Sequence, residues 1–480
     1  MSQPDVLDSA EAGATALRGG ALRAGGYALG LAVTLISTPI LLHHLGVRGF
    51  GEYTTVMALI GLVGTGSEAG LLAIALREYT THEGEARDRV MRQLLGMRVV
   101  VTGGGIVIAT VFGLAVGYRD IQVLGVIAAG GGLMCVMVQG LFAVPLQTTL
   151  RFARVTALDL LRQVLAAAGI VALVLAGASL GWFFLVPVFA GSIMLAATLT
   201  MVRGAMPKVP VLAPRSWSGL LRDTLPFAVA TAIYAAYFRV AIIVMSLGAS
   251  RLETGFFATS YRVIEVLVGL PAFAVTAAFP VLVRAERDDH RRFERATVRM
   301  AEVSLMAGVF ITVAIELAAP LIVDLLTPPE GHPAITVLRI QAPAVIATFV
   351  SVACMFGLLA LRRQRQILLP NALAFATVIV LSVILVDSDA ANGAALATTI
   401  AEVLLAGSIV VLLRRDVPSI DRLARGVPAL ALAAGGALAV LAIPGLSSAA
   451  DTAIGLVIFV AVLAALGRIP PELRHLLRRR

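Results

Sequence analysis

The sequence has 480 residues, of which 59% are hydrophobic and only 14% are charged, and its mean hydropathy is +0.93. Soluble domains carry about 25% charged residues and roughly 45–50% apolar residues, so this composition excludes an ordinary water-soluble protein and indicates a polytopic membrane protein. The formal net charge of +9 would suggest a nucleic-acid partner if the chain were soluble.

Apolar windows long enough to cross a bilayer recur along the whole chain. A helix needs about 20 apolar residues to cross about 30 Å of hydrocarbon, at about 1.5 Å per residue. Bounded by charged clusters or by Gly and Pro turns, such windows predict an all-α fold with about 14 transmembrane helices. In chain order the predicted spans are 19–42, 53–76, 95–117, 121–144, 157–178, 182–202, 224–247, 255–283, 300–319, 334–361, 367–386, 392–413, 428–444 and 452–467.

The basic residues fall on alternate connections between these spans. Thirty-two of the 38 lie near the two termini or in every second connection, and the group after the second span is Arg77, Arg87, Arg89, Arg92 and Arg98. The opposite connections hold only Arg48, Arg119 and Arg251. Because Lys and Arg favour the cytoplasmic side, both termini of this cell-membrane protein are predicted to be cytoplasmic and the number of spans even. This distribution accounts for the net charge without a nucleic-acid partner.

The sequence predicts neither a metal site nor a cofactor. Cys135 and Cys354 fall inside predicted spans, and the six histidines are scattered in loops without ligand spacing. The first 18 residues are polar and carry acids, unlike the basic start of a cleaved signal peptide, so the first span is expected to be retained.

A stretch with three prolines and four basic residues, 203–222, separates six predicted spans from the next six. The predicted organisation is a cytoplasmic tail at 1–18, an N-terminal six-helix lobe at 19–202, a cytoplasmic linker at 203–222, a C-terminal six-helix lobe at 223–415, and two extra helices with a basic cytoplasmic tail at 416–480.

The first hairpin of each predicted lobe shows the same pattern. Leu45-Gly46 and Leu247-Gly248 lie 202 residues apart, and each pair is followed by a glycine at the entry to the next span, Gly51 and Gly255. An even number of spans separates the two copies, which predicts a parallel repeat, an arrangement used for alternating access. The glycine triplets 103–105 and 130–132 are expected to allow close helix packing rather than to bind phosphate.

Three segments resemble a known family. LHHLGVRGFGEYTTVMALIGLVGTGSEAGLLAIALRE at 42–78, ATSYRVIEVLVGLPAFAVTAAFPVLVR at 258–284 and HPAITVLRIQAP at 332–343 are similar to Wzx-type polysaccharide or O-antigen flippases of the MOP (multidrug/oligosaccharidyl-lipid/polysaccharide) exporter superfamily. The resemblance implies two six-helix lobes around a central cavity, two extra C-terminal helices, and movement of polyprenyl-pyrophosphate-linked oligosaccharides to the outer leaflet.

Ionisable residues inside membrane spans are costly and usually face a cavity or a partner. Arg239, Arg262 and Arg339 are the basic residues that remain once those assigned to the termini and the connections are set aside, and a guanidinium matches phosphate oxygens in pairs. Arg239 and Arg262 are the leading candidates to bind a lipid pyrophosphate, and Arg339 is a weaker one near the outer end of its helix. Tyr234 and Tyr237, near Arg239, are candidates to stack on sugar rings, or they are core residues.

Acidic residues in the spans are candidates for ion coupling. Glu68 and Glu402 are deep acids with no local cation in the sequence, and either is expected to take up a proton or sodium ion or to hydrogen-bond across helices. Glu265 lies three residues after Arg262 on one helix face, where it is either a coupling residue or the partner that neutralises Arg262. Glu316 and Asp324 are expected to be solvated near the outer boundary.

The leading functional prediction is a lipid-linked oligosaccharide flippase, a transporter and not an enzyme. Its expected partners are the lipid-linked substrate, membrane lipids, a proton or sodium ion, and a polysaccharide polymerase or glycosyltransferase. A multidrug/cation antiporter of the same superfamily is the alternative, against which arginines in a cavity argue because they repel cations. A membrane glycosyltransferase or ligase would need acids or arginines on a sizeable outer loop, and the outer connections hold only isolated charges.

Overall fold

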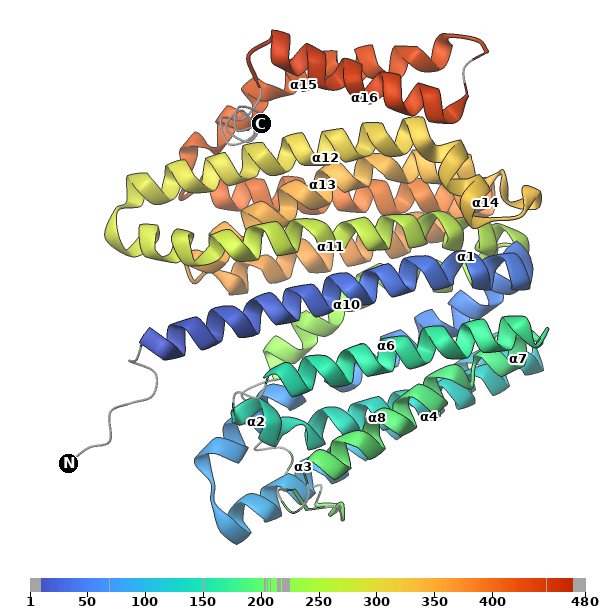
Figure 1. The fold of residues 1–480 in the computed structure, drawn as a ribbon, viewed down its shortest axis with the longest axis vertical. Helices are drawn as coiled ribbons and strands as arrows, with labels where there is room; N and C mark the ends of the chain where they lie inside the picture. Colours follow the sequence, from blue (N-terminus) through green and yellow to red (C-terminus); the bar gives the residue numbers. More distant parts are fainter. Residues whose placement is uncertain are drawn as a thin grey trace. The chain divides into compact units, whose positions relative to one another are not determined.

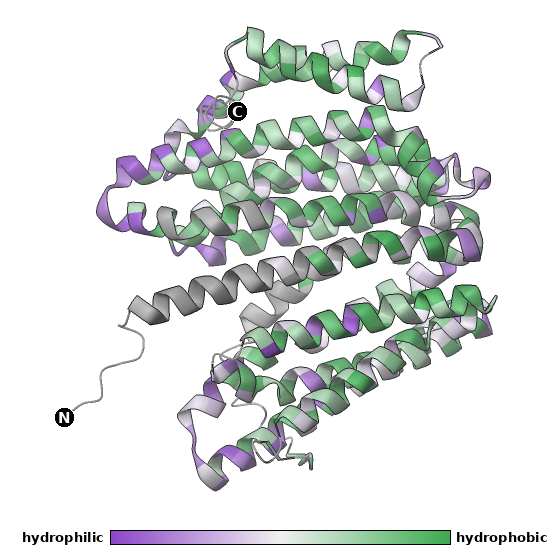
Figure 2. Cartoon of the chain, viewed as in Figure 1, coloured by the Kyte–Doolittle hydropathy of each residue, from purple (hydrophilic) through white to green (hydrophobic). Residues whose placement is uncertain are grey.

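The structure, a computed structural model, describes residues 10–68, 70–149, 152–202, 204, 206–207, 209–213, 217, 225–445 and 447–468. These residues form helices and no strands (Figure 1). Within them, ten helices are long and apolar enough to cross a membrane. Hydrophobic residues run along the helix bodies and hydrophilic residues gather at the ends (Figure 2). The predicted all-α, multi-pass membrane fold is confirmed.

The chain divides into two compact units. Unit 1 comprises Met1–Leu45 and Glu52–Arg239, and unit 2 comprises Gly46–Gly51 and Val240–Arg480. The short segment Gly46–Gly51 thus packs with unit 2 although the helix on either side of it belongs to unit 1. The predicted domain bounds stay a prediction, and most of the predicted linker 203–222 lies outside the described residues.

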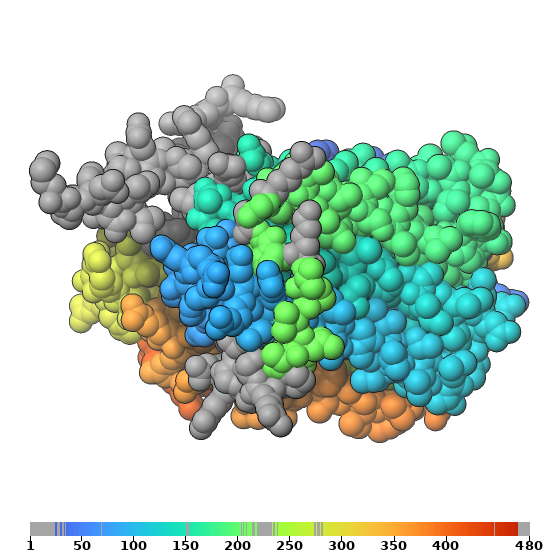
Figure 3. All heavy atoms as spheres, turned by 90° about the horizontal axis from the view of Figure 1, so that it is seen from below, coloured from blue at the N-terminus to red at the C-terminus, as the bar shows by residue number. Residues whose placement is uncertain are grey.

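Unit 1 is built around α4, which packs against α3 and α8, while α8 packs against α6. The helices here are α1 (Ala10–Glu68), α2 (Leu71–Thr81), α3 (Gly84–Ala115), α4 (Asp120–Phe142), α5 (Val144–Thr148), α6 (Phe152–Leu175), α7 (Leu180–Phe183), α8 (Val186–Met201) and the first part of α10 (Leu225–Gly248). Residues 209–213 cross α3, where the Val211 N–H donates to the Arg92 carbonyl at 3.0 Å (Figure 3).

The second predicted span, 53–76, is interrupted in the structure. Helix α1 ends at Glu68, and Gly70 adopts a φ of 76° before α2 begins at Leu71. Glycine reaches this left-handed region without the steric cost that a Cβ would add. The predicted span 53–76 therefore contains a turn at Gly70, and the break places Glu68 at a helix end.

The glycine triplet 130–132 lets α4 and α8 approach closely, as predicted. A Cβ on Gly132 would lie 2.5 Å from the backbone carbonyl carbon of Pro187, in α8. A Cβ on the neighbouring Gly131 would meet only a methyl group of Val188, at 4.0 Å. The close contact between the two backbones therefore requires a glycine at position 132, whereas position 131 has room for a side chain.

Replacing Gly132 with leucine should lower the free energy of unfolding by about 1–3 kcal/mol, because overpacking forces the two backbones apart. Thermal unfolding of the purified protein in detergent measures this effect. Gly131→Leu adds the same side chain to the adjacent position and should leave the transition unchanged. Equal losses in the two variants would contradict a role for the Gly132–Pro187 contact.

Unit 2 is built around α13, which packs against α11, α12 and α14. Its helices are α11 (Arg251–Asp288), α12 (His290–Leu326), η2 (Pro329–Gly331), α13 (Ala334–Ala360), η3 (Gln364–Ile367), α14 (Leu368–Arg414), η4 (Pro418–Arg422), α15 (Leu423–Leu438), η5 (Ala439–Ala442) and α16 (Ser448–Ala465). The hairpin of α15 and α16 packs on α12 through an apolar cluster that includes Val313, Leu430 and Phe459.

Two long helices contain sharp breaks that separate predicted spans. Helix α1 is non-helical at Gly46, with a φ of 67°, and α14 is non-helical at Asp389 and Ala390. At the α1 break, the carboxylate of Glu330 accepts a hydrogen bond from the Val47 N–H at 3.2 Å. With these breaks, all fourteen predicted ranges overlap helical segments.

The repeat glycines contact one another in unit 2. A Cβ on Gly51 would lie 2.7 Å from the backbone nitrogen of Gly255, and one on Gly255 would overlap the carbonyl of Val47. Since neither position leaves room for a side chain, the two glycines that share a place in the predicted repeat are both needed for close backbone packing.

Candidate functional site

Unit 1 contains a buried guanidinium paired with an acid. Arg98 lies on α3 with its side chain 1% exposed, and its Nη2 is 3.0 Å from Oε2 of Glu68. Its Nη1 donates to the carbonyl of Ser67 at 2.8 Å. The side chain of Glu68 is 43% exposed. The pair therefore presents a carboxylate at its accessible end and hides the cation behind it.

This pair corrects two sequence-based interpretations. Arg98 is counted from the sequence with the basic connection after the second span although the predicted third span, 95–117, includes it, and the structure places it inside α3, buried among apolar residues. Glu68 was expected to lack a local cation, and Arg98 supplies one. The apolar residues on both sides of Arg98, in LLGMRVVV, were the signal that would have placed it within a helix.

Arg239 lies on α10 directly against α1. A Cβ on Gly61 would overlap the Nε of Arg239, so the absence of a side chain at Gly61 makes room for the guanidinium. Tyr237 is buried, with 6% of its surface exposed, so its ring is covered in this conformation. Tyr234 is on α10 as well, but its side chain lies outside the described residues.

Arg262 and Glu265 form the ion pair that their spacing predicts on one face of α11. Nη1 of Arg262 donates to Oε2 of Glu265 at 2.6 Å, and the side chains are 34% and 45% exposed. A guanidinium carries five N–H donors, so one carboxylate contact is compatible with binding a phosphate as well.

Arg339, on α13, pairs with Glu316 on α12. Nε of Arg339 is 3.8 Å from Oε2 of Glu316, whose side chain is 20% exposed. The expectation that Glu316 is simply solvated is therefore wrong, because the neighbouring helix provides its counter-charge. Asp324, by contrast, is exposed and lies 3.0 Å from the Nε2 of His332.

Glu402 is the most buried of the three candidate coupling acids, with 6% of its surface exposed. It lies on α14, and its Oε2 accepts a hydrogen bond from the hydroxyl of Thr348 on α13 at 3.1 Å. This is the hydrogen bond across helices that the sequence gives as one of two alternatives for Glu402, and the ion-coupling alternative stays a prediction. A second polar contact inside unit 2, between Ser260 and Gln341, links α11 to α13 and was not found from the sequence.

Within each unit the candidate residues thus form ion pairs and hydrogen bonds that join neighbouring helices or turns. Arg98, Arg262 and Arg339 each have an acid within 4 Å, which lowers the cost of placing them in a membrane. Among the described residues, no three His, Cys, Asp or Glu side chains gather as a metal site would require. These side chains can bind charged or hydroxyl-bearing groups.

A family model described as "Polysaccharide biosynthesis protein" matches residues 17–286. The structure is similar to that of the lipid II flippase MurJ in an inward closed conformation, with a TM-score of 0.77 and 11% identity over 93% of this chain and 99% of that chain. Among curated proteins, none matches this sequence.

Two further structures share the fold. One is an inward-facing multidrug resistance MATE family transporter of the MOP superfamily, with a TM-score of 0.62 and 14% identity over 82% of this chain and 96% of that chain. The other is a MOP superfamily transporter from Pyrococcus furiosus, with a TM-score of 0.53 and 13% identity over 84% of this chain and 94% of that chain. Because the family match spans more than half of the sequence, the chain belongs to the polysaccharide biosynthesis protein family, and its fold is that of the MOP superfamily.

Proposed function

We propose that the protein is an alternating-access transporter, and not an enzyme, that flips a polyprenyl-pyrophosphate-linked oligosaccharide across the cytoplasmic membrane for cell-surface polysaccharide biosynthesis. The observation that carries the proposal is the family match over residues 17–286. The fold supports it, because a lipid II flippase has a similar fold over 93% of this chain.

The arginines in the membrane helices supply the chemistry for an anionic lipid cargo. Guanidinium groups bind phosphate oxygens through paired, charge-assisted hydrogen bonds. Arg262 has this capacity on α11 with its side chain 34% exposed, and Arg239 is half-buried on α10. Because Arg262 and Arg339 are each paired with an acid, their charge alone does not separate an anionic cargo from a cationic drug. The family match favours the lipid-linked cargo.

A leaflet-specific assay tests this function. Proteoliposomes and protein-free vesicles are loaded with a fluorescent polyprenyl-pyrophosphate disaccharide, and an external quencher is added. The fluorescence of lipid from the inner leaflet should fall faster in the proteoliposomes, because the protein moves that lipid to the outer leaflet. Efflux of a cationic dye from the same vesicles should stay at the protein-free rate. Dye efflux without movement of the lipid would replace the flippase with the multidrug/cation antiporter.

Of the candidate coupling acids, Glu402 best combines burial with a hydrogen-bonding partner. A charged carboxylate is costly to bury, and binding a proton or a metal cation removes that charge. Glu68 and Glu265 have side chains that are 43% and 45% exposed and contact arginines. We therefore assign the coupling role to Glu402.

Glu402→Gln should remove the dependence of transport on a proton or sodium gradient while leaving passive flipping in place. The measurement is the flipping rate in proteoliposomes before and after an ionophore collapses each gradient. Thr348→Val removes the hydroxyl that donates to Glu402 but keeps the carboxyl group, so it should retain gradient dependence. A Glu402→Gln protein that responds to the ionophore as the parent does would exclude this residue from coupling.

A further inference from the structure

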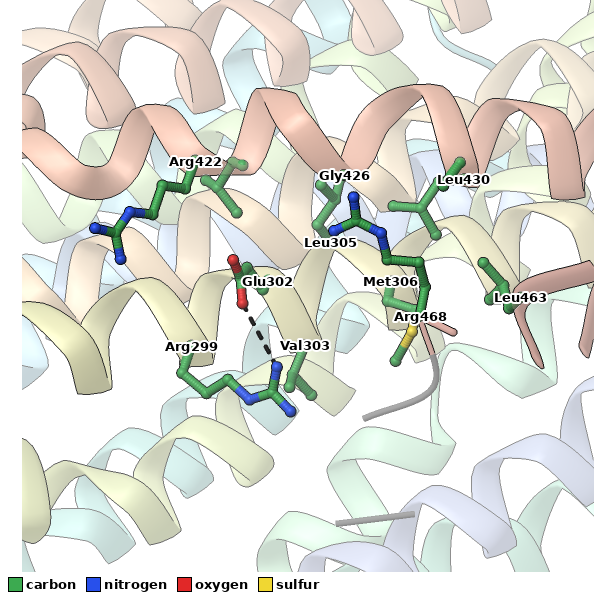
Figure 4. A pocket seen from close by; sticks show the side chains of 12 residues that line it. Arg299, Glu302, Val303, Leu305, Met306, Arg422, Gly426, Leu430, Leu463 and Arg468 are labelled. Carbon is green, nitrogen blue, oxygen red and sulfur yellow. Dashed lines mark ion pairs between the residues drawn. The ribbon is translucent and has the colours of Figure 1, made fainter. Parts of the chain in front are cut away.

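A small pocket in unit 2 lies between α12, the start of α15 and the end of α16. Its cavity volume is about 120 Å³. Three arginines line it from three separate parts of the chain: Arg299 from α12, Arg422 from the end of η4, and Arg468 after the end of α16 (Figure 4). Glu302 is the acid in the lining and pairs with Arg299, Nη1 to Oε2, at 3.6 Å. The lining therefore carries a net positive charge.

The rest of the pocket lining forms an apolar wall. Leu305 and Met306 of α12 contribute to it, together with Leu430 of α15 and Leu463 of α16. Leu430 and Leu463 belong to the apolar cluster that joins the α15–α16 hairpin to α12, and Leu305 and Met306 pack against that cluster. The pocket thus brings three arginines next to apolar side chains, and an amphiphilic ligand can contact both.

The three arginines come from segments that the distribution of basic residues predicts to be on the cytoplasmic side. Arg299 ends the basic group after the eighth span, Arg422 lies between the twelfth and thirteenth spans, and Arg468 follows the last span. The structure brings these three arginines together around one pocket (Figure 4). By the same charge distribution, the pocket lies toward the headgroups of the inner leaflet.

We propose that this pocket binds the phosphate of an anionic glycerophospholipid from the inner leaflet, of the phosphatidylglycerol type, with an acyl chain along the apolar wall. Basic pockets between helices on the cytoplasmic side bind lipid phosphates through charge and hydrogen bonds. The volume is well below the roughly 300–1,000 Å³ of a site that encloses a drug-sized ligand, so the pocket suits a single headgroup phosphate rather than an oligosaccharide. The inference is independent of the transported cargo.

The test uses the full-length protein in nanodiscs that contain phosphatidylcholine with a small fraction of phosphatidylglycerol. Lipid retained by the protein after extraction is measured by native mass spectrometry. The double variant Arg422→Gln/Arg468→Gln should bind phosphatidylglycerol about 30-fold more weakly, since each basic residue near an anionic lipid contributes a factor of about five. Both side chains are exposed, so the fold should not depend on them.

A matched control removes the same charge outside the pocket. Arg284→Gln/Arg292→Gln changes two exposed arginines near the α11–α12 turn that do not line the cavity, and it should bind phosphatidylglycerol as the parent does. Equal losses in the two double variants would show that net charge alone attracts the lipid and would overturn the proposal. Parent-like binding by Arg422→Gln/Arg468→Gln would do the same.

Competition experiments separate the possible sources of the phosphate. Inorganic phosphate should not displace phosphatidylglycerol at equal concentration, because it makes no contact with the apolar wall. Polyprenyl phosphate should displace it no better than another monoanionic lipid does. Preferential binding of polyprenyl phosphate would assign the pocket to the substrate and overturn the phospholipid proposal, while leaving the flippase function intact. Displacement of phosphatidylglycerol by inorganic phosphate would show that the pocket is a general anion site, which would also overturn the phospholipid proposal.

Discussion

Arg98→Met should lower the free energy of unfolding by about 2–3 kcal/mol. The substitution leaves the buried carbonyl of Ser67 without its donor and Glu68 without its counter-charge. Hydrogen bonds to charged groups contribute about 1.5–3 kcal/mol, and breaking a fully buried ion pair costs about 3–5 kcal/mol. The expected loss is smaller than that for a fully buried ion pair because the side chain of Glu68 is 43% exposed and water can hydrate it. Thermal and denaturant unfolding in detergent measure the loss.

The pair itself is tested by a double-mutant cycle with Glu68→Gln. That single change leaves Arg98 as a buried cation without its carboxylate, so it should be destabilising as well. The double variant should lose less stability than the sum of the two single losses, with an interaction energy of at least about 1 kcal/mol. Additive losses would show that the two side chains do not depend on each other.

Arg92→Met provides the matched control for side-chain loss on the same helix. Arg92 is an exposed residue of α3, six positions before Arg98, and removing an exposed side chain usually changes stability by less than about 0.5 kcal/mol. A loss as large as that of Arg98→Met would mean that α3 is sensitive to any lost arginine, which would contradict the role assigned to the buried pair.

The sequence was sufficient to predict most of the helices because each carries about 20 apolar residues between charged ends, a strong and local signal. Helix α13 begins and ends within one residue of the predicted 334–361. The break at Gly70 was missed because the apolar residues continue on both sides of it. An apolar run shows that a segment can enter the membrane, but a single glycine with positive φ redirects the backbone without interrupting the run.

The candidate site was predictable only where its contacts are local. Arg262 and Glu265 are three residues apart on one helix, so helical geometry alone brings them to one face. Glu68 and Arg98, and likewise Glu316 and Arg339, come from different helices. Their meeting depends on how each helix is rotated about its axis and displaced along it, which apolar composition leaves undetermined. Arg98 was grouped with the loop arginines because it lies only a few residues beyond them.

Arg262→Ala should reduce the rate of lipid-linked oligosaccharide flipping by between about 10-fold and 100-fold, since a charge-assisted hydrogen bond to phosphate contributes about 1.5–3 kcal/mol. Arg239→Ala should act in the same direction on α10. The amount of each protein in the membrane should stay at the parent level, because the side chain of Arg262 is 34% exposed and its pairing partner Glu265 is 45% exposed and remains hydrated.

The ion pair on α11 allows substrate binding to be separated from structural pairing. If Arg262 binds the pyrophosphate, Glu265→Gln should keep or increase transport, because it removes a competitor for the guanidinium. The exchange Arg262→Glu/Glu265→Arg keeps a pair at the same spacing but moves the cation by almost one turn, so it should stay inactive. If the pair serves only to neutralise itself, the exchange should restore transport and Glu265→Gln should fail as Arg262→Ala does. Full transport by the Arg239→Ala/Arg262→Ala double variant would exclude both arginines from pyrophosphate binding.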